Sequence, residues 1–180
     1  MQFIPTKLRD AFLIEPSPHA DQRGVFVRMF CQEEFAKAGL ETNFVQANRS
    51  MSELKGTLRG MHMQASPHSE VKLVQCMRGA VFDVVIDLRP NSETYMGWVG
   101  YELTESNRRQ LYVPKGFAHG FQTLSDGAEV GYLVSNFYNK DAERGVRFDD
   151  PTFGIQWPLN VTMVSDKDSS WPPYSEERLS

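Results

Sequence analysis

The sequence predicts an all-β protein in which antiparallel strands form a sandwich, a jelly roll or a barrel. The 13 glycines and 10 prolines break the chain into short segments, and most of these segments favour strands. Only one convincing short helix is expected, over residues 32–38, with Gly39 at the position that ends it. Strands do not alternate with long helices, so a parallel sheet with crossover helices is disfavoured.

The clearest strand covers residues 80–88, where side chains alternate between two faces. The even-numbered residues from Phe82 to Leu88 are all apolar and share one face, whereas the odd-numbered face includes Asp83 and Asp87. Further strands are expected over residues 73–77, 98–103, 110–113, 118–124, 129–136 and 145–148.

Composition is ordinary for one soluble domain, with 180 residues of which 41% are hydrophobic and 23% charged. We therefore expect a single domain over residues 1–180, with an irregular polar tail from about residue 165 that packs over the barrel. The net charge of −4 argues against a nucleic-acid binder. No apolar run is long enough to span a membrane and no signal peptide is visible, so a cytoplasmic protein is expected. Cys31 and Cys76 lack metal-type spacing, and no disulfide is expected.

The most informative segment is strand-like and places Arg59 and His62 close together, followed by Lys72. Imidazole exchanges a proton near neutral pH, and the two cations suit an anionic substrate or a developing oxyanion. This combination indicates one wall of an active site.

His119 ends a Pro-x-Gly-x-x-His pattern that begins at Pro114, which is the spacing of the second cupin motif. Metal-binding cupins also need a His-x-His and a glutamate on an earlier strand, but here His62 is followed by Met63 and Gln64. Two histidines with one amide make a poor zinc or iron site. The sequence therefore predicts a cupin-type jelly-roll barrel with a few short helices and no bound metal.

Metal-free proton transfer next to a carbonyl requires a base, a group that stabilises the enolate and an acid on the other face. His62 suits the base, particularly if a carboxylate orients it, and Lys72 suits the enolate oxygen. Tyr132, on the strand expected over residues 129–136, is the candidate acid.

The chain resembles the nucleotide-sugar 3,5-epimerases, a family typified by dTDP-4-dehydrorhamnose 3,5-epimerase. The resemblance runs in order through about residues 1–170 and is carried by segments 21–26, 46–50, 58–64, 72–74, 78–89, 107–111, 114–121, 143–147, 149–151 and 154–158. It implies a homodimeric enzyme without a cofactor that inverts C3, C5 or both in a nucleotide-diphosphate-linked 4-keto-6-deoxyhexose, in rhamnose-type deoxysugar biosynthesis.

The resemblance also implies roles for individual residues. His62 would be the base, Lys72 would stabilise the enolate and Tyr132 would be the acid. Asp168 would pair with His62, with Asp166 as its rival. The residues implied to bind the sugar, nucleotide or diphosphate, some of them across a dimer interface, are Arg23, Phe26, Arg28, Gln46, Asn48, Arg59, Asp83, His119, Tyr138, Glu143 and Lys167.

Several positions depart from the family pattern. Arg28 stands where an acidic residue is usual in the segment that reads the base, which leaves dTDP, CDP and GDP open. Met63 replaces an aromatic residue, Glu70 and Val71 replace a Gln-Gly pair, and Leu133 replaces a lysine. The carbon that is inverted and the final deoxysugar also stay open. The competing hypotheses are a ketosugar isomerase on the same fold, a metal-dependent cupin oxygenase and a non-catalytic binding module.

Overall fold

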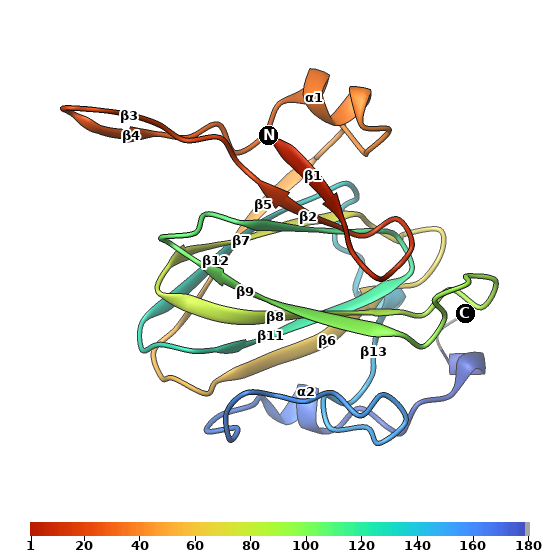
Figure 1. Ribbon diagram of the computed structural model, residues 1–180. Coiled ribbons are helices and arrows are strands. Elements are labelled where there is room, and N and C mark those ends of the chain that lie inside the picture. The colour runs from red at the N-terminus through yellow and green to blue at the C-terminus, as the bar shows by residue number, and fades with distance from the viewer. Residues whose placement is uncertain (179–180) are drawn as a thin grey trace.

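A computed structural model describes residues 1–178 of the protein and has two antiparallel sheets that face each other (Figure 1). The larger sheet contains, in spatial order, β1 (Gln2–Pro5), β2 (Phe12–Glu15), β10 (Gln110–Val113), β7 (Lys72–Arg78), β12 (Ala128–Val134) and β5 (Gln46–Ser52). The smaller sheet contains β13 (Glu143–Gly145), β6 (Leu58–Gln64), β11 (Phe117–Thr123), β8 (Ala80–Asp87) and β9 (Trp98–Thr104). This arrangement confirms the all-β prediction.

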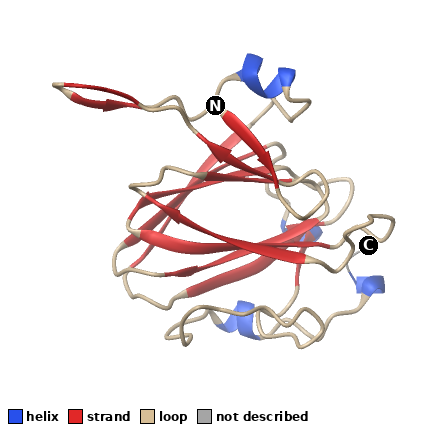
Figure 2. Ribbon diagram, viewed as in Figure 1, coloured by secondary structure: helices blue, strands red, loops and turns tan. Residues whose placement is uncertain are grey.

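Helices are few and short (Figure 2). Helix α1 (Gln32–Lys37) lies over the outer face of the larger sheet, and α2 (Asp166–Ser169) lies in the C-terminal segment beneath the smaller sheet (Figure 1). Two 3-10 turns cover Lys140–Ala142 and Glu176–Arg178. None of the helices in residues 1–178 has the length and apolar character needed to cross a membrane.

The alternation expected in residues 80–88 is confirmed, because β8 packs against a different core on each side. Val81 and Val85 join the apolar core between the sheets. Phe82, Val84 and Ile86 face a second core on the outer side of the smaller sheet, which Phe153 and Trp157 of the C-terminal segment help to cover. The C-terminal segment is thus fixed to the barrel by apolar burial.

Apolar side chains fill only part of the space between the sheets. The core there is contributed mainly by β8, β9, β10 and β11, together with Leu13 of β2, two residues of β7 and the first half of β12. Where β5, β6 and the first residue of β7 meet, polar side chains replace them and a cavity remains. The barrel therefore has a packed part and an open part.

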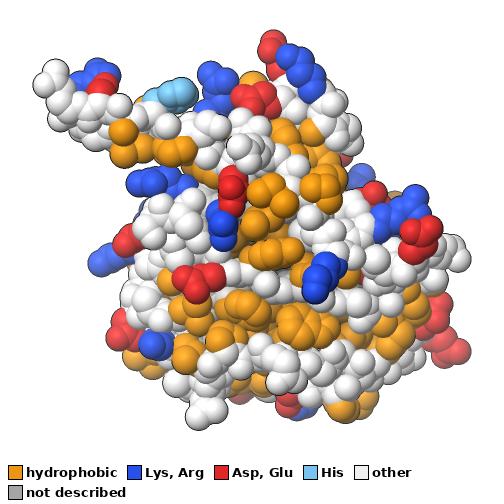
Figure 3. Space-filling model, in the orientation of Figure 1, with side chains coloured by type: hydrophobic (Ala, Val, Ile, Leu, Met, Phe, Trp, Pro, Cys, Tyr) orange, Lys and Arg blue, Asp and Glu red, His pale blue; other side chains and the backbone are white. Residues whose placement is uncertain are grey.

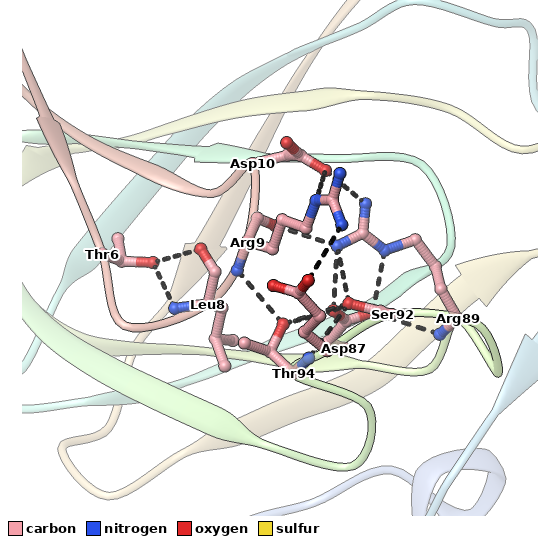
Figure 4. Close-up of polar contacts among 9 residues, drawn as sticks. Thr6, Leu8, Arg9, Asp10, Asp87, Arg89, Ser92 and Thr94 are labelled. Atoms are coloured by element: carbon pink, nitrogen blue, oxygen red, sulfur yellow. Dashed lines mark hydrogen bonds and ion pairs between the residues drawn. The ribbon is translucent and has the colours of Figure 1, made fainter.

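A polar cluster ties the turn between β1 and β2 to the loop after β8 (Figure 4). Asp87 is fully buried and accepts hydrogen bonds from Arg89 Nη2 at 2.8 Å, Ser92 Oγ at 2.5 Å and Thr94 Oγ1 at 2.7 Å. Arg89 also reaches Asp10 Oδ2 at 2.8 Å. Burial opposes ionisation of Asp87, but these hydrogen bonds outweigh it and hold the pKa of its carboxyl below the usual value.

Strand positions are mostly as the sequence predicts. Residues 110–113 match β10, and the other central strands agree to within two residues. The strand expected over residues 145–148 is wrong in position, because β13 pairs Glu143 with Gln64 and Gly145 with His62. The tail from residue 165 is not wholly irregular, since Ser165 caps α2 by accepting a hydrogen bond from the Asp168 N–H.

Candidate active site

A cavity of about 540 Å³ opens between the two sheets where the apolar core ends. Its walls come from β5, β6, β7, β11, β12 and β13 and from the C-terminal segment around α2. The predicted site residues that line it are Gln46, Asn48, Arg59, His62, Lys72, His119, Tyr132, Tyr138, Glu143, Lys167 and Asp168. Segments distant in sequence thus supply one site.

His62, in the middle of β6, is paired with a carboxylate of α2. Its Nε2 lies 2.7 Å from Asp168 Oδ1, and Asp168 Oδ2 accepts the Gly60 N–H at 3.0 Å. Burial opposes ionisation of Asp168, yet the hydrogen bonds from His62, Gly60 and Ser165 prevail and the pKa of its carboxyl is lowered. Asp168 therefore remains ionised at neutral pH and can orient the imidazole and stabilise its protonated form.

The rival carboxylate, Asp166, is exposed on the other side of α2. Residues two positions apart on an α-helix point in roughly opposite directions. The buried position beside His62 therefore belongs to Asp168.

Lys72 is the first residue of β7 and lies on the wall formed by the larger sheet. Its Nζ lies 3.2 Å from Glu70 Oε1 and donates to the His62 carbonyl oxygen at 3.2 Å. The ammonium is therefore held within reach of the His62 backbone, which brings the expected base and enolate-stabilising groups to one place.

Tyr132 lies on β12, next to β7, and its side chain points inward between the apolar core and the cavity. Burial raises the pKa of its phenol, and the nearby Arg59 only partly offsets this effect. The hydroxyl is therefore protonated at neutral pH, as a proton donor requires.

Arg59 and His119 complete the wall formed by the smaller sheet. Arg59 is fixed by hydrogen bonds to Ser52 Oγ at 3.0 Å and the Met51 carbonyl at 2.9 Å. His119 Nε2 lies 2.8 Å from Asp83 Oδ1, and both side chains are buried. Asp83 thus contacts His119 and does not itself line the cavity.

A second group of polar residues surrounds the part of the cavity next to α2. Glu143 pairs with Lys167 and accepts a hydrogen bond from Tyr138 at 3.1 Å. Partial burial opposes ionisation of Glu143, but Lys167 prevails and the pKa of the carboxyl is lowered. On β5, Gln46 Nε2 donates to Asn48 Oδ1 at 2.9 Å.

Besides Asp83, three predicted binding residues lie outside this cavity. Arg23 and Phe26 belong to the hairpin formed by β3 (His19–Asp21) and β4 (Gly24–Phe26), which projects away from the barrel (Figure 1). Phe26 is 66% exposed, and Arg23 is bonded to Asp21 of the same hairpin. Arg28, shortly after the hairpin, pairs with Glu34 of α1 at 3.2 Å.

The sequence interpretation missed two buried residues that support the site. Glu70 pairs with Lys72, and Gln64 Nε2 donates to Glu70 Oε2 at 2.9 Å. The sequence feature that could have revealed this pair is Glu70 itself, two positions before Lys72. Glu70 was noted as a departure from the family pattern, but its ion pair with Lys72 was not expected.

The two cavity histidines, His62 and His119, do not share a set of metal donors among the described residues. Across residues 1–178, no three His, Cys, Asp or Glu side chains gather in a metal-binding arrangement. His62 and His119 each contact one carboxylate, which is an arrangement suited to proton transfer or hydrogen bonding.

The two-sheet barrel and its acid–base cavity define a cupin-like protein with a candidate proton-transfer site. A family model described as dTDP-4-dehydrorhamnose 3,5-epimerase matches residues 5–176. The dTDP-4-dehydrorhamnose 3,5-epimerase of Shigella flexneri is 46% identical over 93% of this chain and 93% of its own length. This chain therefore belongs to the dTDP-4-dehydrorhamnose 3,5-epimerase family.

Solved structures agree in fold. The crystal structure of dTDP-4-dehydrorhamnose 3,5-epimerase from Elizabethkingia anophelis has a TM-score of 0.95 and 41% identity, over 99% of this chain and 98% of that one. A 3,5-epimerase from Legionella pneumophila, solved in complex with dTDP-4-keto-L-rhamnose, has a TM-score of 0.88 and 37% identity, over 97% of this chain and 98% of that one.

Proposed function

We propose that this epimerase inverts C3, C5 or both in a nucleotide-diphosphate-linked 4-keto-6-deoxyhexose, in deoxysugar biosynthesis. The observation that carries the proposal is that His62, Lys72, Tyr132 and Asp168 all line one cavity. The Legionella relative, with its bound dTDP-linked ketosugar, supports the substrate class.

Proton abstraction begins at His62. Its Nε2 faces Asp168, so the N–H at this nitrogen donates to the carboxylate and the lone pair on Nδ1 accepts the proton alpha to the ketone. The electron pair left on carbon delocalises onto the C4 oxygen as an enolate. The Lys72 ammonium stabilises that oxygen, a type of interaction whose loss costs on the order of 10²–10³-fold in rate.

Reprotonation from the other side of the enolate inverts the carbon. We assign this step to Tyr132, because its protonated hydroxyl faces the cavity from the opposite sheet to His62. The proton passes from the phenol to carbon, and exchange with water then restores both Tyr132 and His62.

Solvent exchange tests the proposed reaction directly. Incubation with dTDP-, CDP- and GDP-linked 4-keto-6-deoxyhexoses in deuterated water should introduce deuterium at each inverted carbon, which NMR can assign. Label at one carbon would define a mono-epimerase and label at two a di-epimerase. No exchange with any of these ketosugars would contradict the proposal, and a 3-keto product would favour a ketosugar isomerase.

We propose a homodimer in which each β3–β4 hairpin completes the partner's cavity. The two strands pair only with each other within residues 1–178, and a lone two-stranded hairpin is marginally stable in water. Val25 and Phe26 are 50% and 66% exposed, and apolar side chains lie on the projecting arm in Figure 3. A second copy would cover this surface and bring Arg23 to a cavity that otherwise lacks it.

The cytoplasmic location stays a prediction of the sequence.

Mixing two inactive variants tests this assembly. If Arg23 acts across the interface, Arg23→Ala and His62→Ala protomers should regain exchange activity when co-refolded, because one cavity of each mixed dimer has both residues. Sedimentation measures the mass of the assembly. A monomeric enzyme with full activity would contradict the proposed dimer.

A further inference from the structure

The Lys72 side chain is a buried cation, with only 11% of its side-chain surface exposed. An ammonium has three N–H donors. Its Nζ donates a hydrogen bond to the His62 carbonyl at 3.2 Å and forms an ion pair with Glu70 Oε1 at 3.2 Å, which leaves donor capacity for a ligand in the cavity. The two protein partners thus restrict the position of the ammonium that a substrate can use.

Glu70 is itself held rigidly. Its side chain is only 7% exposed, and Oε2 accepts a hydrogen bond from Gln64 Nε2 at 2.9 Å. Gln64 is fixed in turn, because its Nε2 also donates to the His68 carbonyl at 3.0 Å and its Oε1 accepts the Asn139 N–H at 2.6 Å. The carboxylate therefore has little freedom to move away from Lys72.

The other carboxylates of the cavity are engaged elsewhere. Among the described residues that line it, the acidic side chains are those of Glu70, Glu143 and Asp168. Asp168 contacts His62, and Glu143 contacts Lys167 and Tyr138. Glu70 is thus the carboxylate that compensates the charge of Lys72.

A buried ammonium without a counter-ion tends to lose its proton, because burial disfavours the charged form. Lysine also has a flexible stem, so an unrestrained ammonium samples many positions. An ion pair with a fixed carboxylate counters both effects before substrate binds, which is the preorganisation that electrostatic catalysis requires.

We propose that Glu70 is a positioning residue that keeps Lys72 charged and aimed at the enolate oxygen, with Gln64 holding Glu70 in place. This role rests on the proposed epimerase function. It predicts that removal of the negative charge at position 70 affects turnover and its alkaline limit more than substrate binding.

Other titratable or charged groups surround the same cavity and must be unchanged in the test. They are Arg59 and His62 on β6, His119 on β11, Tyr132 on β12, Glu143 on β13 and Asp168 on α2. Lys167 and Tyr138, also in the lining, are both bonded to Glu143. A change confined to position 70 leaves all of these groups in place.

Glu70→Gln preserves the shape of the side chain and removes its charge. The value of kcat should fall roughly 10²-fold while KM changes little, because the misdirected donor acts mainly on the transition state. The alkaline limb of the kcat profile should move to lower pH, because the ammonium is lost more readily. Glu70→Asp, which keeps the charge, should retain the wild-type alkaline limb even if its kcat is reduced, and it serves as the second variant if Glu70→Gln folds poorly.

Glu129→Gln is the matched control. Glu129 is also a buried glutamate paired with a cation, Arg49, but neither residue lines the cavity. This variant should keep both the wild-type kcat and the wild-type pH profile. Equal effects of Glu129→Gln and Glu70→Gln would overturn the positioning role.

A measurement independent of activity separates this proposal from the proposed function. In the intact protein, side-chain NMR of the Lys72 amine, assigned with Lys72→Arg, should show a titration midpoint at lower pH in Glu70→Gln than in the wild type. An unchanged midpoint, or an unchanged kcat, would overturn the role of Glu70 alone. Absence of deuterium exchange in the wild type would instead contradict the epimerase function itself.

Discussion

Two buried aspartates of this barrel, Asp87 and Asp168, are both held as carboxylates, but their surroundings differ. Asp87 is enclosed by Arg89, Ser92 and Thr94, and this network closes on itself (Figure 4). Asp168 contacts His62, whose side chain is 32% exposed and faces the cavity. Asp87 therefore helps to join two segments of the chain, whereas Asp168 supports a histidine that is accessible to a substrate in the cavity.

The two regions also differ in how completely their polar groups are satisfied. Around Asp87 each partner is bonded within the protein, and Arg89 additionally lies over the Phe117 ring at 4.8 Å. In the cavity, His62, Lys72 and Tyr132 all line the open space. Saturated networks contribute mainly to stability, whereas unsaturated ones are available for a substrate.

His62→Ala should separate catalysis from stability most clearly. Deuterium exchange at both carbons should fall by about 10²–10⁴-fold or more, because the base is lost, while nucleotide affinity measured by calorimetry should stay nearly intact. His68→Ala is the control, since His68 contacts Asn139 and does not line the cavity. Retained turnover in His62→Ala would refute its role as the base.

Asp87→Ala should show the opposite pattern, with stability lost and chemistry kept. Removing one partner of a buried ion pair costs about 3–5 kcal/mol, so chemical denaturation should show a large drop in the free energy of unfolding. Exchange activity at low temperature should remain close to that of the wild type. Asp149→Ala removes an exposed partner of Arg147 and should have a much smaller effect.

The pH dependence of this difference has a definite sign. The pKa of Asp87 is lowered in the folded state. Its contribution to the free energy of unfolding is therefore fully present above the pKa of an unfolded aspartate, which is about 3.9. It is lost as the pH falls through the lower folded value. The stability gap between wild type and Asp87→Ala should therefore narrow in acid, and a gap independent of pH would contradict the assignment.

Tyr132→Phe tests the proposed acid, which faces the cavity from the larger sheet. Reprotonation should slow by about 10²-fold and the product stereochemistry should change, because the acid on the second face is missing. Tyr101→Phe is the matched control, since Tyr101 packs against the same apolar core but does not line the cavity. An unchanged rate and an unchanged product would remove Tyr132 from the mechanism.

The strands of the barrel were predictable where apolar side chains alternate, as in β8, and unpredictable where the inward face is polar. On β5, Gln46, Asn48 and Ser50 face the cavity while Met51 faces out and is 63% exposed, so the usual pattern is reversed. The short strands β3 and β4 are exposed throughout and carry no alternation signal.

The location of the candidate site was predictable because its main side chains lie on recognisable strands. His62, Lys72 and Tyr132 fall on β6, β7 and β12, and antiparallel pairing of β7 with β12 brings two of them to one wall. The choice between Asp166 and Asp168 depended on where α2 begins in a tail without periodicity. The ion pair of Glu70 with Lys72 depended on the path of the loop before β7, which local sequence does not specify.

Arg28→Glu is expected to have the smallest effect. Arg28 lies outside the cavity of its own protomer, paired with Glu34, and in the proposed dimer the nearby hairpin would carry it toward the partner's nucleotide. Replacing a partly exposed cation by a carboxylate should shift the KM ratios among dTDP-, CDP- and GDP-linked ketosugars by roughly two- to tenfold, with kcat nearly constant. Lys37→Glu imposes the same change of charge on the neighbouring α1, where the side chain is exposed, and should leave these ratios unaltered. Equal nucleotide profiles in wild type and Arg28→Glu would show that Arg28 does not read the base.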